Sequence, residues 1–305
     1  VVVAHADHDE LVAARATSPL VLGHGEGETF VASDVPALLP YTRRVTYLED
    51  GELVTVRAEG ARLFGPDGTP RPLRIDTVEW DAEAAEKGGW PHFMLKEIYE
   101  QPDVLRAVMA DRIAASGDDV QLDLSVDLAS VDRVVIVAAG TASYAGLVGE
   151  TLIERLARVP AEVEVASEFR YRRPVLGPGT LVIAVSQSGE TIDTLEALRE
   201  ARRAGARTLG ILNVQGSSIA REVDDVLYMH AGPEIGVAST KVYTAMIASL
   251  ALLAVRLGRA HGTLASDDAR ALLDELATLP TMLATALERR DAARVVARGL
   301  ARARS

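Results

Sequence analysis

Hydrophobic and polar positions in the first quarter of the chain predict short strands joined by tight turns. The predicted strands are 20–22, 29–32, 45–48, 53–56 and 62–64. Gly51 and Gly68 each follow an aspartate at a turn, where glycine accepts a positive φ, so these strands are expected to pair antiparallel. The runs are short and no covering layer is evident, so we expect a piece of a larger sheet.

The pattern changes in the centre of the chain, where β-branched runs alternate with helical segments. The predicted strands are 133–139, 163–165, 181–185, 208–213 and 225–229. A continuous apolar run such as 133–139 is typical of a strand that is buried on both faces. Strands that alternate with helices pair in parallel through right-handed crossovers. The centre is therefore predicted to be an α/β fold with helices on both faces of a parallel sheet.

The segments that flank this sheet are predicted to be a linker and helices. Residues 76–89 are polar and acidic, which favours a linker. Residues 93–114 have helical spacing that Pro102 interrupts, which predicts two short helices. The expected helices after the last strand are 241–257, 266–279 and a third that begins after Pro280.

Composition narrows the class of protein. The chain is 48% hydrophobic and 25% charged, and no apolar run reaches the roughly 18 residues that a membrane span needs, so we expect no membrane association and a cytoplasmic location. A formal net charge of −12 disfavours nucleic acid as a partner. These residues include no cysteine, which excludes thiolate metal sites and a cysteine nucleophile among them. We expect neither a metal nor a cofactor.

The loop 186–191, with the sequence SQSGET, carries the clearest chemical signal. It follows the buried strand 181–185 and precedes a helix, so it lies at the sheet edge where open α/β folds bind ligands. The start of a helix presents free N–H groups that attract an anion, and each charged hydrogen bond from the loop would contribute about 1.5–3 kcal/mol. The simpler interpretation is a helix cap. A cap needs one hydroxyl and the loop has three, so we favour phosphate binding.

Two more segments have the same character. Residues 140–143 (GTAS) form a second turn from strand to helix, which would share one ligand with the loop 186–191 if the two strands are neighbours. Residues 236–241 (GVASTK) precede the long helix 241–257 and could close over that ligand through Ser239. For both segments a helix cap is the alternative interpretation.

Several longer motifs support a family resemblance. They are SQSGET at 186–191, ASEFRYR at 166–172, AGPEIGVASTK at 231–241 and HFMLKEIYEQP at 92–102. Together they resemble the first sugar isomerase (SIS) domain of the glutamine:fructose-6-phosphate aminotransferase family, also called glucosamine-6-phosphate synthase. The resemblance covers most of the chain.

This resemblance implies a domain organisation. It implies a flavodoxin-like SIS domain with a parallel sheet, preceded by an antiparallel β remnant of an amino-terminal-nucleophile glutaminase domain. The implied divisions are 1–75 for the end of the glutaminase (type 2 amidotransferase) domain, 76–118 for a linker and helices, 119–262 for the first SIS domain, and 263–305 for helices that lead to a second SIS domain.

The resemblance also implies a function in hexosamine biosynthesis, the formation of glucosamine 6-phosphate from fructose 6-phosphate and glutamine. By matching motif positions, the residues implied to bind the sugar phosphate are Thr141, Ser186, Gln187, Ser188 and Thr191, with Val237 and Ser239 at the sugar. The family commonly has cysteine-glycine-threonine, then serine or alanine, then an aromatic residue, whereas this chain has AGTASY at 139–144. Ala142 therefore lacks the phosphate hydroxyl that a serine would supply there, and Ser143 is a candidate replacement.

The resemblance further implies that this sequence lacks some of the groups that catalyse the whole reaction. The family's glutaminase nucleophile is a cysteine, and its general base, ring-opening histidine and Schiff-base lysine belong to the second SIS domain and its tail. We therefore assign no catalytic residue and expect binding of fructose 6-phosphate or glucosamine 6-phosphate, a homodimer through the SIS domain, and no complete reaction. The alternatives are a regulatory SIS module that senses a sugar phosphate, and an independent isomerase, which would need a base near the sugar's first two carbons.

Overall fold

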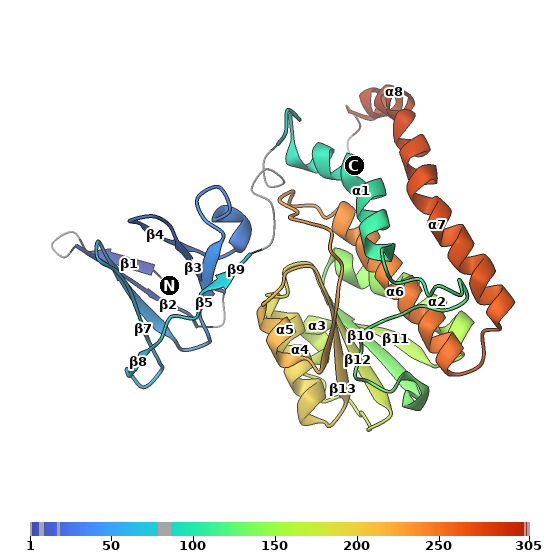
Figure 1. Cartoon of the computed structure of the whole chain (residues 1–305), viewed down its shortest axis with the longest axis horizontal. Coiled ribbons are helices and arrows are strands. Elements are labelled where there is room, and N and C mark those ends of the chain that lie inside the picture. Colours follow the sequence, from blue (N-terminus) through green and yellow to red (C-terminus); the bar gives the residue numbers. More distant parts are fainter. Residues whose placement is uncertain (1, 6–8, 17–18, 79–86, 302, 304–305) are drawn as a thin grey trace.

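The computed structural model describes residues 2–5, 9–16, 19–78, 87–301 and 303. Figure 1 shows a β lobe, built from the first part of the chain, beside an α/β part that carries the long helices. The β lobe has two antiparallel sheets. One has the strand order β1-β2-β6-β7-β8, formed by Val2–His5, Glu10–Ala14, Leu53–Arg57, Gly60–Phe64 and Pro70–Arg71. The other has the order β4-β3-β5-β9, formed by Thr29–Ala32, Val21–His24, Arg44–Tyr47 and Asp76–Thr77.

The two sheets of the β lobe cover each other. Leu22 from one sheet packs in a buried cluster with Ala13, Val54 and Leu63 from the other. The short 3₁₀ helix Val35–Ala37 covers the remaining face of the β4-β3-β5-β9 sheet. The strands therefore form two packed sheets, and the unpredicted strands β1 and β2 belong to the second layer.

The α/β part is built on a parallel sheet, which confirms the fold predicted from the alternating strands and helices. Its strand order is β11-β10-β12-β13-β14. In that order the strands are Ala161–Val165, Arg133–Ala138, Thr180–Ser186, Arg207–Leu212 and Asp225–Tyr228. This order, 2-1-3-4-5 along the chain, is the flavodoxin-like one, and its direction of winding reverses between β10 and β12.

Helices cover both faces of this sheet (Figure 1). In β10, Val134 and Ile136 face one buried cluster, while Val135 and Val137 face the other, as the alternation along a strand requires. The first cluster includes residues of α1, α2, α6 and α7, which span Phe93–Met109, Thr141–Ala157, Lys241–Ala260 and Ser266–Glu288. The opposite cluster includes residues of α3, α4 and α5, which span Ala166–Phe169, Ile192–Arg203 and Ser218–Glu222.

Two predictions about proline are wrong. Helix α1 continues through Pro102, and α7 continues through Pro280 as far as Glu288, so the third helix is α8 at Arg290–Leu300. Proline at 102 cannot donate to the carbonyl oxygen of Ile98, but the side-chain Nε2 of Gln101 donates to that oxygen at 2.9 Å. The side chain thus replaces the missing backbone bond and α1 stays continuous.

Two other features bear on the predicted linker and on the apolar helix α6. Asp76–Thr77 pairs with β5, so the β lobe extends into the segment 76–89, and residues 79–86 of that segment lie outside the described residues.

Helix α6 is long and apolar enough to cross a membrane, but 78% of its most apolar window is buried in this structure. That burial identifies α6 as the central helix of the core.

The contact of α2 with α6 depends on a glycine. A Cβ atom at Gly149 would lie 2.9 Å from Cδ1 of Leu250, which is too close without movement. We expect Gly149→Ala to lower the free energy of unfolding by about 1–3 kcal/mol, measured by urea denaturation. Gly299→Ala in the exposed helix α8, where a Cβ meets nothing within 4 Å, is the control and should not destabilise. Equal stability of Gly149→Ala and the parent chain would contradict close packing of α2 on α6.

Candidate functional site

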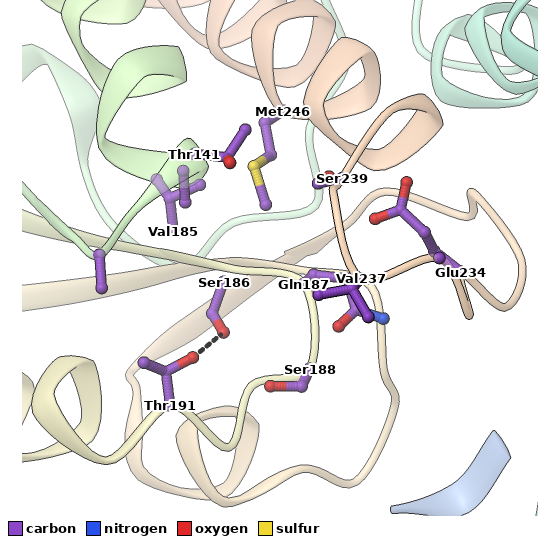
Figure 2. Close-up of a pocket in the computed structure, with 13 residues that line it drawn as sticks. Thr141, Val185, Ser186, Gln187, Ser188, Thr191, Glu234, Val237, Ser239 and Met246 are labelled. Atoms are coloured by element: carbon purple, nitrogen blue, oxygen red, sulfur yellow. Dashed lines mark hydrogen bonds between the residues drawn. The ribbon is translucent and has the colours of Figure 1, made fainter. Parts of the chain in front are cut away.

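A cavity of about 200 Å³ opens at the carboxyl edge of the parallel sheet (Figure 2). Three connections surround it: the turn after β10, the loop after β12 and the segment before α6. The residues that line the cavity are Ala139, Thr141, Ala142, Val185, Ser186, Gln187, Ser188, Thr191, Glu234, Gly236, Val237, Ser239 and Met246.

The pairing of the central strands brings the first two connections together. β10 pairs in parallel with β12, and Val137 lies opposite Ala184. The two strands therefore end side by side, and each leads into a helix, α2 or α4. Gly140 has a φ of 57°, which glycine adopts readily, and it lets α2 begin at the next residue.

Two serine hydroxyls fix the shape of the loop 186–191. The Oγ of Ser186 accepts a hydrogen bond from the Gly189 N–H at 3.0 Å and lies 3.2 Å from Oγ1 of Thr191. The Oγ of Ser188 accepts from the Glu190 N–H at 3.1 Å. These serines bond the loop's own amides and not the amides of helix α4, so they do not act as the helix caps of the simpler interpretation.

The starts of α2 and α4 remain available to a ligand. Gly140 and Thr191 are the N-cap residues, and neither makes a side-chain hydrogen bond to its helix. The first N–H groups of both helices therefore lack a capping side chain, and the positive end of each helix dipole lies at the sheet edge where the cavity opens. No lysine or arginine is among the lining residues, so N–H groups and hydroxyls supply the attraction for an anion.

The third connection carries a carboxylate. Oε1 of Glu234 accepts from the N–H groups of Thr240 at 2.8 Å and Val242 at 3.2 Å, which caps α6 from within the segment. Ser239 has a buried Oγ without a hydrogen-bond partner among the described residues, and Val237 is fully exposed. A buried hydroxyl without a partner beside a cavity is available to a bound molecule.

The structure brings together every predicted site residue except one. Ser143 is not among the lining residues, because its Oγ donates to the carbonyl oxygen of Gly140 at 2.7 Å, while Ala142 occupies the lining position. Glu234 and Met246 also line the cavity, and neither is among the predicted site residues. Glu234 lies within the motif at 231–241, seven residues before the first residue of α6, and its place in that motif is the only signal that the sequence offers.

The β lobe contacts the outer side of the loop 186–191. Arg15, only 5% exposed, donates from Nη2 to Oγ of Ser218 at 2.7 Å and lies 3.4 Å from Oε2 of Glu190. Oε1 of Glu190 accepts from the Ser218 N–H at 2.7 Å. Burial and, next, the Glu190 carboxylate raise the pKa of the Tyr47 phenol at the same contact. Arg15 and Glu190 are 175 positions apart, so no local pattern in the sequence predicts this pair.

Gly189 offers a test of the loop's conformation. Its φ is 66°, and a Cβ atom there would lie 2.0 Å from Oγ of Ser217. We expect Gly189→Ala to lower the free energy of unfolding by about 1–3 kcal/mol more than Gly205→Ala, measured by urea denaturation. Gly205 has a φ of 82° and nothing within 4 Å of its Cβ position, so it isolates the steric contact from the backbone penalty. Equal losses in the two variants would mean that the loop does not pack against Ser217.

Comparisons with known proteins agree on the α/β part. The family model of the SIS domain matches residues 127–256. Among solved structures, the C-terminal domain of glucosamine-fructose-6-phosphate aminotransferase from Francisella tularensis superposes with a TM-score of 0.68 and 34% identity, over 71% of this chain and 62% of that chain. The SIS domain expected from the sequence motifs is thereby confirmed.

Curated relatives extend the similarity across the β lobe. Glutamine–fructose-6-phosphate aminotransferase (isomerizing) of Thermus thermophilus is 59% identical over 290 residues, which are 95% of this chain and 48% of that relative. The protein of the same name from Clostridium tetani is 47% identical, over 94% of this chain and 48% of that relative. The chain thus spans about half the length of the curated relatives it matches.

Proposed function

We propose that this chain, a homologue of one part of the glutamine–fructose-6-phosphate aminotransferases, binds fructose 6-phosphate or glucosamine 6-phosphate in the cavity at the ends of β10 and β12. The sugar phosphate is inferred from the names of the relatives. The cavity is lined by hydroxyls and lies beside backbone N–H groups that can bind a phosphate. The proposed phosphate residues are Thr141, Ser186, Gln187, Ser188 and Thr191. The proposed sugar residues are Val237 and Ser239. We place Ser143 outside this set because its hydroxyl is already bonded to Gly140.

The observation that carries the proposal is the pair of helix starts without capping side chains, beside the hydroxyl-rich loop. An anion at this end gains N–H donors and the positive ends of two helix dipoles. Glu234 lies at the opposite side of the cavity, where its carboxylate would repel a phosphate and accept hydrogen bonds from sugar hydroxyls. The charges therefore orient the ligand with its phosphate at the loop 186–191 and its sugar at the segment before α6.

The cavity lining offers few groups that could catalyse the aminotransferase reaction. Glu234 is the only acidic or basic side chain among the lining residues, and two backbone N–H groups already bond its Oε1. The 305 residues include no cysteine for a thiolate nucleophile. We therefore propose that these residues contribute substrate binding to the aminotransferase reaction and form no glucosamine 6-phosphate alone. The domain limits 1–75, 76–118, 119–262 and 263–305 belong to this proposal, except that Asp76–Thr77 joins the first of these units because it pairs with β5.

We also propose a homodimer through the α/β part. Tyr144 and Leu147 on α2 and Val165 on the edge strand β11 are exposed apolar side chains, of the kind that a protein interface covers. We expect sedimentation equilibrium to give twice the mass of 32.5 kDa for the parent chain, and Leu147→Asp to shift the equilibrium toward the monomer. A monomer at all concentrations would contradict the proposal.

Thr191 gives the sharpest test of phosphate binding. Thr191→Val keeps the shape of the side chain and removes the hydroxyl, so we expect the Kd for fructose 6-phosphate to rise about 10- to 150-fold, measured by calorimetry. Thr278→Val is the control, because Thr278 is exposed and its hydroxyl donates to the carbonyl oxygen of Glu275 within α7. Absence of binding in the parent chain, or equal Kd values in both variants, would overturn the proposed site. Formation of glucosamine 6-phosphate from fructose 6-phosphate with glutamine or ammonia would overturn the proposal that the chain forms no product alone.

A further inference from the structure

One face of helix α1 contacts the segment that contributes the sugar residues. Glu97 on this face is 2% exposed, and its Oε1 accepts from the N–H groups of Ile235 at 2.6 Å and Gly236 at 3.0 Å. Its Oε2 lies 3.2 Å from the Gly236 nitrogen. Hydrogen bonds to an ionised carboxylate are among the stronger ones in proteins. A buried charge on α1 is thus satisfied by the backbone of a segment 139 positions away.

Gly236 makes this contact possible. Gly236 lines the cavity, and a Cβ atom there would lie 2.5 Å from Oε2 of Glu97. The backbone and the carboxylate therefore meet directly, with no space for a side chain between them. The cavity and Glu97 lie on either side of a single stretch of backbone.

Ile235 packs against the buried cluster of the β lobe, and the other hydrogen bonds to the segment lie only at its ends. Asn213 holds the beginning, where its Nδ2 donates to Gly232 O at 2.7 Å and its Oδ1 accepts from Ala231 N–H at 2.9 Å. Glu234 holds the end through Thr240 N–H. Within the described part of the chain, Glu97 alone forms hydrogen bonds with residues 235–239. The middle of the segment has no second anchor of this kind.

We propose that Glu97 is a positioning residue for the sugar end of the site, and this inference rests on the proposed function. Glu97 touches no ligand in this proposal. It holds residues 235–239, among which Val237 and Ser239 line the cavity shown in Figure 2. The loop 186–191 keeps its shape through its own serines, which make no hydrogen bond to α1. Loss of Glu97 therefore weakens contacts to the sugar and leaves contacts to the phosphate.

This difference can be measured with two ligands. We expect Glu97→Ala to raise the Kd for fructose 6-phosphate about 10-fold or more, because two backbone N–H groups lose their acceptor, and Glu97→Gln to raise it less, because the amide oxygen still accepts. The Kd for inorganic phosphate should stay within about 2-fold in both variants. Asp103→Asn is the matched control, since it removes a carboxylate from the exposed side of the same helix and should change neither Kd.

Amide hydrogen exchange gives a second readout that needs no ligand. Exchange at residues 235–239 should be faster in Glu97→Gln than in the parent chain and unchanged in Asp103→Asn. Unchanged exchange, unchanged binding of fructose 6-phosphate, or equal losses for both ligands would each overturn the inference. If Glu97→Ala does not fold, Glu97→Gln carries both measurements. If the parent chain does not bind fructose 6-phosphate, the proposed function fails while the exchange result still decides the role of Glu97.

Discussion

The parallel pairing of β10 with β12 is the constraint on which the site depends. Because Val137 lies opposite Ala184, the two strands end together, and the helices that follow them begin at the same edge of the sheet. The winding of the sheet reverses between these strands, so α2 and α4 lie on opposite faces and leave a crevice between their starts. If this register changed by one residue, the two helix starts would lie farther apart, and their N–H groups would no longer be directed at one ligand.

Each wall of the cavity is held by a different part of the molecule. Serine hydroxyls hold the loop 186–191 from within, and Arg15 of the β lobe supports it from outside through Glu190. Glu97 and Asn213 hold the segment before α6. The site is therefore not a property of the five-stranded sheet alone, because α1 and the β lobe both contribute contacts that fix its loops.

Local patterns predict the sheet and the loop 186–191, because buried strands and hydroxyl-rich turns can be recognised in short stretches of sequence. The family resemblance, and not a local pattern, adds Thr141 and Val237 to the predicted site. Long-range contacts were not predictable in this way. The continuity of α1 depends on Gln101 bonding Ile98 O beside Pro102, a compensation that helix propensity does not contain. The Glu97 contact joins residues that only the folded chain brings together, and the second layer of the β lobe came from strands whose pattern was too short to recognise.

The central claim is that a sugar phosphate is held by its phosphate at the two helix starts. A crystal structure of the chain with fructose 6-phosphate measures this directly. We predict that the phosphate oxygens lie within hydrogen-bonding distance of Oγ1 of Thr191 and of backbone N–H groups at the start of α4, with the sugar toward Val237 and Ser239. A phosphate bound beside Glu234, or outside the cavity, would contradict the claim.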